Sequence, residues 1–373
     1  DRAQFNVEKF KTLSDIKHIP LLKKKELIFL QSIGPRLGGL LTKDIGELKR
    51  IFLSPGPIFD PEDRMDDYWG YTEAFYSVGF RPGDVVQVTF NYHLSPAGLM
   101  FEEPLRNLGC ASIPAGPTDP GTQLDIMQKL RVSGYVGTAS YLMHLAQKAE
   151  EKGINLRKDL SQEVAFVTGE RLSEKMRNQL EKKFDIIMRQ GYGTADVGCI
   201  GYECFHRTGL HIANRCYVEI CHPDTGIPLK DGEVGEIVVT SFNKTYPLIR
   251  LATGDLSYID RSPCPCGRTS PRLGSIVGRV DTTARISGMF VYPHQVEQVM
   301  SRFEEIKRWQ IVVTNPDGID EMTLNIEASE FKRRDELLQQ FREKIKLRPE
   351  LKVLAPGSLP PQVRPIDDKR HWD

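Results

Sequence analysis

Cysteines and histidines provide the first candidates for chemistry in this chain of 373 residues. Cys264 and Cys266 flank a proline in Cys-Pro-Cys-Gly, and Cys204, followed closely by His206 and His211, lies upstream of them. Three thiolates and one imidazole make a tetrahedral donor set for Zn²⁺ that leaves no position open for catalysis. The spacing therefore predicts a structural zinc site, with either histidine as the fourth ligand. The alternative is that these are ordinary buried or surface cysteines.

Three further segments combine glycine with charged side chains. Gly-Tyr-Gly-Thr at 191–194 is followed by Asp196, Thr-Gly precedes Asp255, and Arg279 and Asp281 stand before a second glycine-containing loop. Glycine lets the backbone approach a ligand closely, and a nearby carboxylate can hold a hard cation. A carboxylate such as that of Asp255 can also accept hydrogen bonds from two neighbouring hydroxyls, as a ribose offers them. Taken singly, each segment also fits a simple tight turn.

The segments between about residues 80 and 205 alternate in a way that would position these turns. Short β-branched runs end in glycine-rich turns, and the runs are separated by helical patterns, one of them with Met176, Leu180 and Phe184 on a single face. Strand, turn and helix at this spacing predict a sheet of parallel strands with helices on its faces. Because ligands of such sheets bind at the carboxyl ends of the strands, we expect the glycine-rich turns to lie at the site.

Other parts of the chain have a different character. The first 50 residues predict a lysine-rich helical entry segment, in which Lys23, Lys24 and Lys25 form a solvated face. After about residue 205 the pattern suggests a β meander or small barrel, and residues 281–373 suggest a small β/α domain. We therefore predict a large domain over residues 1–280 and a small one over 281–373.

Composition limits the class of protein. The 50 basic residues balance the 50 acidic ones, which removes the bulk electrostatic argument for binding nucleic acid or an anionic membrane. No apolar run approaches the length that spans a bilayer, and the N-terminal residues do not form a signal peptide. Seven cysteines are too few for a disulfide scaffold, and Cys110, Cys199, Cys216 and Cys221 are expected to be small core side chains. We expect a soluble cytoplasmic globular protein.

Taken together and in this order, the motifs resemble those of the adenylate-forming superfamily, most closely the phenylacetate–CoA ligase-like branch. The matching segments are TGERLS (168–173), YGTAD (192–196), LIRLATGD (248–255), GRVDTTARISGMFVYPHQVE (278–297) and PGSLP (356–360). The resemblance implies a large N-terminal domain, with α/β sheets and a barrel region, and a small mobile α+β C-terminal domain. It implies that Mg-ATP activates a carboxylic acid as an acyl-adenylate, which a thiol, usually that of CoA, then captures. It also suggests a homodimer.

Roles for individual residues follow from the same resemblance. Nucleotide contacts are implied for Gly169, Glu170, Tyr192, Gly193, Thr194, Asp255 and Arg279, the last two of these at the ribose. Asp196 would bind Mg²⁺, Asp281 would be the hinge, and the Gly288 region would line the path of the thiol. Tyr92, His93 and Gly98 lie where the branch shapes its acid site. Some members also have a similar Glu-Cys…Gly-x-His…Cys-Pro-Cys-Gly arrangement, which favours His211 over His206 as the zinc ligand.

The chain departs from the family pattern at two places where phosphate is handled. The phosphate loop is expected near residues 52–60, where Pro55 and Pro57 remove two N–H donors and leave only Ser54 and Gly56 as remnants. The acylation lysine is replaced by Arg364, whose planar guanidinium has a different geometry, and Lys369 is a less suitable substitute. Because the net charge is zero, phosphate binding would depend on local donors such as Arg250, Arg279 and Arg364.

The leading hypothesis is therefore an ATP-dependent acid–thiol ligase that forms an acyl-CoA from an aromatic or other small apolar acid. Its ligands would be ATP or AMP, Mg²⁺ and CoA, with a structural Zn²⁺. Two alternatives stay open from the sequence. In one, an amine or a carrier-protein thiol captures the adenylate, and in the other the fold binds a nucleotide or an acid without turnover.

Overall fold

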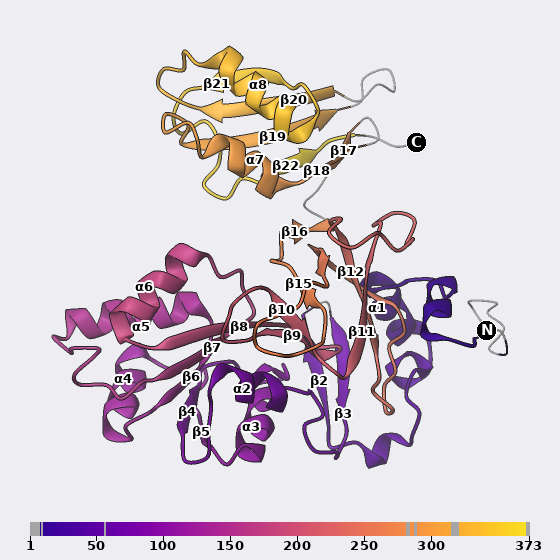
Figure 1. Cartoon of the computed structure of the whole chain (residues 1–373), viewed down its shortest axis with the longest axis vertical. Coiled ribbons are helices and arrows are strands. Elements are labelled where there is room, and N and C mark those ends of the chain that lie inside the picture. Colours follow the sequence, from indigo (N-terminus) through magenta and orange to yellow (C-terminus); the bar gives the residue numbers. More distant parts are fainter. Residues whose placement is uncertain are drawn as a thin grey trace. The chain divides into compact units, whose positions relative to one another are not determined.

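The alternating segments of residues 85–194 form the parallel half of one nine-stranded sheet in the computed structural model (Figure 1). The structure describes residues 8, 10–55, 57–280, 284–286, 289–314 and 321–370. The parallel strands are β4 (Val85–Val88), β5 (Ala111–Pro114), β6 (Gly134–Gly137), β7 (Val164–Val167) and β8 (Ile187–Thr194), in the order β5-β4-β6-β7-β8. Antiparallel strands β9 (Gly198–Glu203), β10 (Leu210–Ile212), β15 (Arg272–Leu273) and β14 (Ile259–Asp260) continue the sheet from β8.

Helices cover both faces of the parallel half (Figure 1). They are α2 (Thr72–Val78), α3 (Ala97–Asn107), α4 (Pro120–Lys129), α5 (Ala139–Glu151) and α6 (Glu174–Phe184). Side chains of neighbouring strand residues point to opposite faces, so Phe166 packs with α2 and α3 while Ala165 and Val167 pack with α4, α5 and α6. The N-termini of α4, α5 and α6 are capped by the side chains of Asp119, Thr138 and Ser173, which accept hydrogen bonds from backbone N–H groups. The predicted strand–helix alternation of this region is confirmed.

A second sheet pairs a strand near the start of the chain with strands that follow residue 215. Strands β11 (Cys216–Cys221), β12 (Gly235–Ser241) and β13 (Leu251–Ser257) lie next to one another, and β1 (Leu22–Lys23) joins β13 in parallel. This pairing places the following helix α1 (Lys24–Ile33) beside the sheet region. Strands β2 (Arg50–Ser54) and β3 (Ile58–Glu62) form a hairpin, and β16 (Gly278–Arg279) pairs with β13. Short 3₁₀ helices span Leu13–His18, Arg36–Gly39 and Ile45–Glu47.

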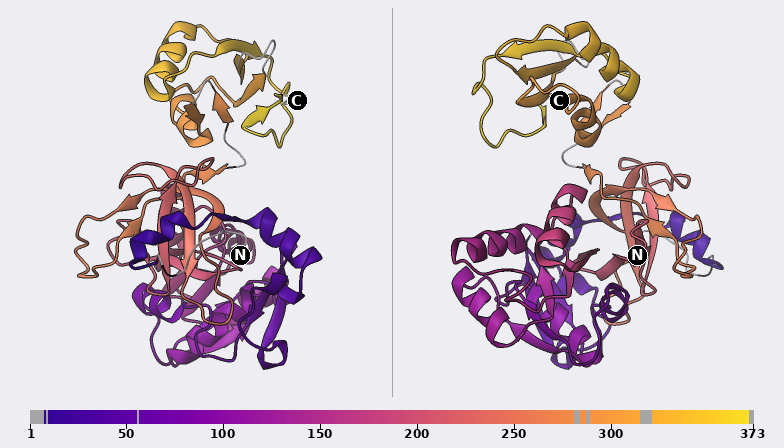
Figure 2. Two further views of the ribbon diagram at one scale, coloured as in Figure 1. Left: turned by 90° about the vertical axis from the view of Figure 1, so that its right-hand side faces the viewer. Right: turned by 60° about the vertical axis from the view of Figure 1, so that its left-hand side comes forward.

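The last part of the chain has its own hydrophobic core. It contains the hairpin β17 (Ala284–Ile286) and β18 (Met289–Val291), and a four-stranded sheet of β19 (Arg308–Thr314), β20 (Glu321–Glu327), β21 (Glu350–Leu354) and β22 (Ile366–Asp368). Helices α7 (Pro293–Met300) and α8 (Arg334–Ile345) pack beside each other on one face of this sheet (Figure 2). In β20 the alternating residues Met322, Leu324 and Ile326 are buried, as the sequence predicts.

The chain divides into two compact units. One comprises residues 1–253 and 257–275, and the other comprises residues 254–256 and 276–373. The predicted boundary at Asp281 lies outside the described residues and stays a prediction. Cys110, Cys199, Cys216 and Cys221 are buried, as expected. Among the described residues, we find no helix with the length and apolar character needed to cross a membrane.

Candidate active site and metal centre

The end of β8 and the turn that leads to β9 hold the residues of the predicted nucleotide motif. At Gly193 a Cβ atom would run into the Tyr71 hydroxyl and the carbonyl oxygen of Gly198, so only glycine fits without moving the backbone. The hydroxyl of Thr194 accepts a hydrogen bond from the backbone N–H of Val197 at 3.3 Å and closes the turn. Tyr192 precedes them in the same strand and is half-buried. The turn therefore has a fixed backbone at the end of the last parallel strand.

Asp196 follows this turn and is bound by a cation that the sequence did not suggest. Its side chain is 1% exposed, and its Oδ2 atom accepts a hydrogen bond from the Lys24 ammonium at 2.7 Å. The prediction that the lysine triplet is a solvated face is wrong for Lys24, although Lys25 is exposed. Strand β1 explains the difference, because its pairing with β13 fixes the start of α1 and directs Lys24 to the turn. Residues 172 positions apart leave no local signal of such a contact.

A second carboxylate, that of Asp60 in β3, lies near Asp196. Asp60 is 1% exposed, and neither of its carboxylate oxygens has a hydrogen-bond partner among the described residues. Burial, together with the charge of Asp196, raises the pKa of Asp60 to about 8, although Ser54 and Lys24 act in the opposite direction. Asp60 belongs to the segment 52–60 in which the phosphate loop was expected, but there the sequence pointed only to Ser54, Pro55, Gly56 and Pro57. A negatively charged side chain in a segment that is expected to bind phosphate was the signal that could have identified Asp60.

Gly169 and Glu170 form the turn after β7, the strand next to β8. Gly169 has a φ of +83°, a backbone conformation that favours glycine. The carboxylate of Glu170 accepts hydrogen bonds from the backbone N–H of Ser140 at 2.6 Å and from its hydroxyl at 2.8 Å. These bonds fix the turn to the N-terminal end of α5. The turns at 169–170 and 192–196 follow neighbouring parallel strands and so lie at the same edge of the sheet.

The residues predicted for the acid pocket do not all come together. The ring of Tyr92 lies so close to Gly98 in α3 that a Cβ there would be 2.6 Å from the ring. Burial and neighbouring Glu102 raise the pKa of the Tyr92 hydroxyl. Phe90, which packs on Phe101, places its aromatic ring near the turn of Gly169. His93, in contrast, is exposed.

The predicted ribose residues face each other across the pairing of β13 and β16. Asp255 and Arg279 are direct register partners, and their carboxylate and guanidinium groups lie 3.0 Å apart. The prediction that Arg250 donates to phosphate is wrong. Its side chain is buried and binds Glu219, the sulfur of Cys221 and three backbone carbonyl groups, so its donors are already used. The predicted hinge residue Asp281 lies outside the described residues.

Arg364, the predicted counterpart of the acylation lysine, is exposed in the second unit. Its backbone carbonyl accepts a hydrogen bond from the Gln310 side chain at 3.2 Å, which fixes the chain just before β22. Lys369 is also exposed and lies 3.4 Å from the carboxylate of Asp367. Gly56, one of the two loop remnants, and Gly288 lie outside the described residues.

The four predicted zinc ligands do come together in the first unit. One donor atom from each of Cys204, His211, Cys264 and Cys266 lies within 4.8 Å of all the others. The sulfur atoms of Cys204 and Cys264 are 3.7 Å apart, and the Cys266 sulfur is 3.4 Å from Nε2 of His211. His206 is exposed and does not belong to this group. The cluster joins the β9–β10 segment to the loop between β14 and β15.

The surroundings of this cluster favour the thiolate of Cys264 but not that of Cys204. Burial raises the pKa of Cys264, but hydrogen bonds from the Cys266 backbone and from the Thr208, Cys266 and His211 side chains lower it to about 5. The pKa of Cys204 is instead raised to about 11, chiefly by burial, and the neighbouring thiols add to this. The other ring nitrogen of His211, Nδ1, lies 3.2 Å from the Ser270 hydroxyl, which orients the ring. The chemistry of the donor set and its burial fit tetrahedral Zn²⁺.

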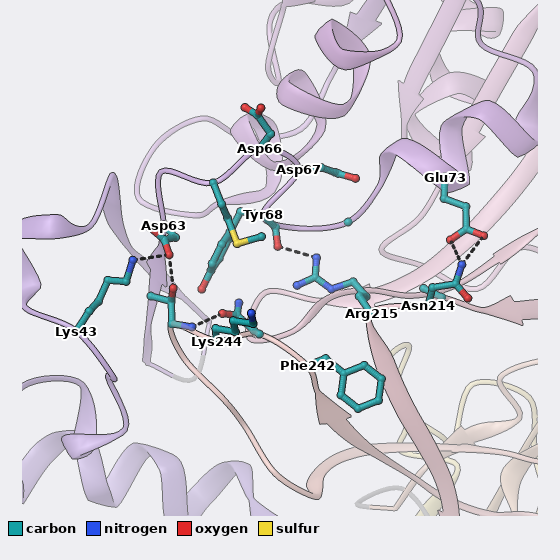
Figure 3. A pocket seen from close by; sticks show the side chains of 15 residues that line it. Lys43, Asp63, Asp66, Asp67, Tyr68, Glu73, Asn214, Arg215, Phe242 and Lys244 are labelled. Carbon is teal, nitrogen blue, oxygen red and sulfur yellow. Dashed lines mark hydrogen bonds and ion pairs between the residues drawn. The ribbon is translucent and has the colours of Figure 1, made fainter. Parts of the chain in front are cut away.

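A separate cavity of about 650 Å³ in the first unit contains none of the predicted site residues (Figure 3). Residues after β3, in the β10–β11 turn and at the end of β12 line it. Several of its charged groups bind within its own wall. Lys43 pairs with Asp63 at 2.8 Å, and Glu73 accepts two hydrogen bonds from Asn214 at 3.3 Å (Figure 3). We therefore do not assign the nucleotide to this cavity.

Sequence comparisons identify relatives that fit this arrangement. Residues 69–244 match the model of the AMP-binding enzyme family, and residues 288–369 match that of the AMP-binding enzyme C-terminal domain. The chain is 31% identical over 348 residues to a phenylacetate–coenzyme A ligase of Thermus thermophilus, an alignment that covers 88% of this chain and 76% of the relative. It is 25% identical over 383 residues to the ligase of the same name from Escherichia coli, with 96% and 86% covered.

Solved structures show the same fold. An open conformation of 2-hydroxyisobutyryl-CoA ligase, in complex with 2-HIB-AMP and CoA, superimposes with a TM-score of 0.86 at 24% identity. The superposition covers 98% of this chain and 85% of that one. ATP-bound MatB from Rhodopseudomonas palustris gives a TM-score of 0.59 at 16% identity, with 87% and 67% covered. The fold is that of the adenylate-forming enzymes, with an α/β N-terminal part and a small C-terminal part.

Proposed function

The chain belongs to the AMP-binding enzyme family as an AMP-forming acid–CoA ligase, and from this premise we propose that its acid is aromatic and phenylacetate-like. The observation that carries the proposal is the 31% identity to a phenylacetate–coenzyme A ligase over most of both chains. The aromatic ring of Phe90 near the turn of Gly169 and that of Tyr92 beside Gly98 support it, because apolar aromatic walls suit an aryl group. His93, which is exposed, is not proposed as a pocket residue.

The reaction requires two successive displacements. In the first, a carboxylate oxygen of the acid attacks the α-phosphorus of ATP, and the bond to pyrophosphate breaks. In the second, the sulfur of CoA attacks the acyl carbon, AMP leaves and the thiol proton passes to solvent or base. Since a carboxylate is a weak nucleophile, the protein must hold the reactants in line and neutralise charge at phosphorus.

We propose roles for the site residues on this basis. The turns at Gly169–Glu170 and Tyr192–Thr194 would contact the adenosine, and Asp255 and Arg279 would bind the ribose. Asp196 would hold Mg²⁺ with the phosphates, because its buried Oδ1 atom has no partner among the described residues and a carboxylate suits a hard cation. Arg364 would supply positive charge to the adenylation half-reaction, and Asp281 would be the hinge residue. A homodimer remains a prediction, which light scattering after size exclusion would test.

Pyrophosphate exchange into ATP tests the adenylation step directly. With Mg²⁺ present, we expect phenylacetate and close aryl acids to support exchange well above acetate and 2-hydroxyisobutyrate. Exchange with small aliphatic acids alone would overturn the aromatic assignment, and no exchange with any acid would overturn adenylation. Arg364→Ala, with Lys369→Ala as the matched control, should lower exchange, whereas equal rates for both variants would remove Arg364 from the mechanism.

The final acceptor is tested with the same acid. Chromatography of the products should show the CoA thioester and AMP in equal amounts when CoA is added. Release of the acyl group only to an amine or to a carrier-protein thiol would favour the alternative acceptor. The CoA-ligase names of the two relatives support CoA.

We also propose that Cys204, His211, Cys264 and Cys266 hold a structural Zn²⁺. The four donors are protein side chains, so none of the usual four positions is left for substrate, and the metal would fasten two β loops together. Metal analysis of freshly purified protein should find about one zinc per chain. His211→Ala should lose the metal, whereas His206→Ala should keep it. A wild-type zinc content far below one per chain would contradict the proposal.

A further inference from the structure

The β2–β3 hairpin brings an unpaired carboxylate to the buried surroundings of Asp196. Both oxygens of Asp60 and the Oδ1 atom of Asp196 are buried without a hydrogen-bond partner among the described residues. The two carboxylates interact electrostatically with each other, and each is influenced by Lys24. Tyr246, whose pKa is raised chiefly by burial, also senses both negative charges. Three carboxylate oxygens therefore lie in one buried region without a hydrogen-bond partner within the described part of the chain.

Such an arrangement is costly unless something else binds there. Buried polar atoms of folded proteins nearly always have partners, and a buried charge needs a counter-charge. Asp60 and Asp196 together carry two negative charges when ionised, while Lys24 supplies one positive charge. When both are ionised, one negative charge remains without compensation, and in the absence of a cation burial and this charge raise the pKa of Asp60. Ser54, which is close to Asp60, uses its hydroxyl in a 3.4 Å hydrogen bond to the carbonyl oxygen of Ile58.

The position of Asp60 adds a second argument. It belongs to the segment 52–60, where the sequence predicts contact with the phosphates of ATP and where Pro55 and Pro57 remove N–H donors. An aspartate at such a place would repel phosphate. A divalent cation reverses this effect, because it can bind carboxylate oxygens on one side and phosphate oxygens on the other.

We propose that Asp60 and Asp196 together bind one divalent cation, such as Mg²⁺, and that the Lys24 ammonium occupies part of this site until the cation displaces it. The inference rests on the proposed function and extends it, since Asp196 alone was expected to hold the metal. Two carboxylates with water or phosphate completing the shell match the coordination that Mg²⁺ prefers. With both aspartates ionised, binding of the cation changes the net charge of the three side chains from −1 to +1, which attracts the nucleotide.

Binding of Mn²⁺ to the nucleotide-free enzyme tests this inference without any acid or turnover. Free Mn²⁺ is measured by electron paramagnetic resonance during a titration of the zinc-containing protein. We expect one site in the wild type, binding at least about tenfold weaker in Asp60→Asn, and partial recovery in Asp60→Glu. Lys24→Met should bind Mn²⁺ more tightly than the wild type, because the competing ammonium is gone. Asp66→Asn, an exposed aspartate elsewhere, is the matched control and should not change the affinity.

The outcomes separate this inference from the proposed function. If the wild type binds no Mn²⁺ in the millimolar range, or if Asp60→Asn binds it as tightly as the wild type, the paired site is refuted even when pyrophosphate exchange is normal. If Mn²⁺ binding follows the expected order while no acid supports exchange, the cation site stands and adenylation fails. Circular dichroism of each variant shows whether a loss of Mn²⁺ binding is caused by unfolding. If Asp60→Asn does not fold, the Mn²⁺ affinity of Lys24→Met still tests the site.

Discussion

Replacement of Arg177 by methionine should destabilise the unit that carries the nucleotide turn. Arg177 in α6 is fully buried and donates to both oxygens of Glu203, at 2.7 and 2.8 Å, and to the carbonyl oxygen of Met188 at 3.0 Å. Glu203, at the end of β9, also accepts the backbone N–H of Gln190 in β8 at 2.8 Å. The ion pair therefore joins a helix to the two strands that flank the turn at 192–196.

The expected magnitude follows from burial. Methionine fills much of the space of the arginine stem, but it leaves the Glu203 carboxylate 3% exposed without its cation. Loss of one partner of a buried pair costs about 3–5 kcal/mol. For a unit of this size a loss of 1 kcal/mol lowers Tm by roughly 2–4 °C, so a decrease on the order of 10 °C is expected. The double variant Arg177→Met/Glu203→Gln should recover more than half of the loss, because the glutamine is neutral and can still accept from Gln190.

Differential scanning calorimetry at pH 7 measures these changes. Arg207→Met is the matched control, since Arg207 is exposed and its guanidinium contacts Glu181 only at 3.4 Å. An exposed pair of this kind contributes about 0–1 kcal/mol, so the control should melt close to the wild type. Two results would contradict this reasoning. One is a loss of less than about 1 kcal/mol in the free energy of unfolding of Arg177→Met. The other is a double variant that is no more stable than the single one.

Three other changes have expected outcomes. Gly193→Ala forces a Cβ into the Tyr71 hydroxyl and should lower pyrophosphate exchange by about 100-fold, whereas Gly46→Ala, which has open space around it, should leave the rate unchanged. Asp255→Ala should weaken AMP binding roughly tenfold or more in calorimetry through loss of a charged hydrogen bond, and an unchanged affinity would remove Asp255 from the ribose site. Asp60→Asn should change the pH dependence of stability in the absence of added divalent cations. The folded-state pKa of Asp60, about 8, lies above the unfolded value near 3.8, so the wild type should lose stability relative to the variant as pH rises from about 4 to 8. A difference in Tm that stays constant between pH 5 and 8.5 would contradict this.

Local patterns of the sequence were sufficient for much of the fold. Apolar runs that end in glycine predicted the parallel strands, and the spacing of Met176, Leu180 and Phe184 predicted α6, in which Leu180 and Phe184 are buried. The cysteine spacing likewise predicted a cluster that the structure brings together. These predictions succeed because each depends on residues that lie close together in the sequence. This is true of the periodicity of strands and helices and of the spacing of metal ligands.

Long-range contacts of charged side chains could not be predicted in this way. The sequence predicts that Lys24 belongs to a solvated lysine triplet, whereas the pairing of β1 with β13 directs it to Asp196. Arg250 stands in a motif that suggests a ligand, yet Glu219 and backbone carbonyl groups occupy its guanidinium. In both cases the partner comes from a distant strand, and the identity of the residue alone does not tell which partner it meets.

The supply of positive charge for phosphate limits how this chain can bind ATP. The chain has no net charge, so attraction of a polyanion must come from single groups near the phosphates. Pro55 and Pro57 remove backbone donors, and Arg250 is already bound within the protein. Arg279 is paired with Asp255, which leaves it as a ribose-side group with its charge partly neutralised. Two adjacent buried carboxylates are poor phosphate ligands but good ligands for a divalent cation. A metal held by Asp60 and Asp196 would therefore supply, at one point, the charge that the altered loop no longer provides.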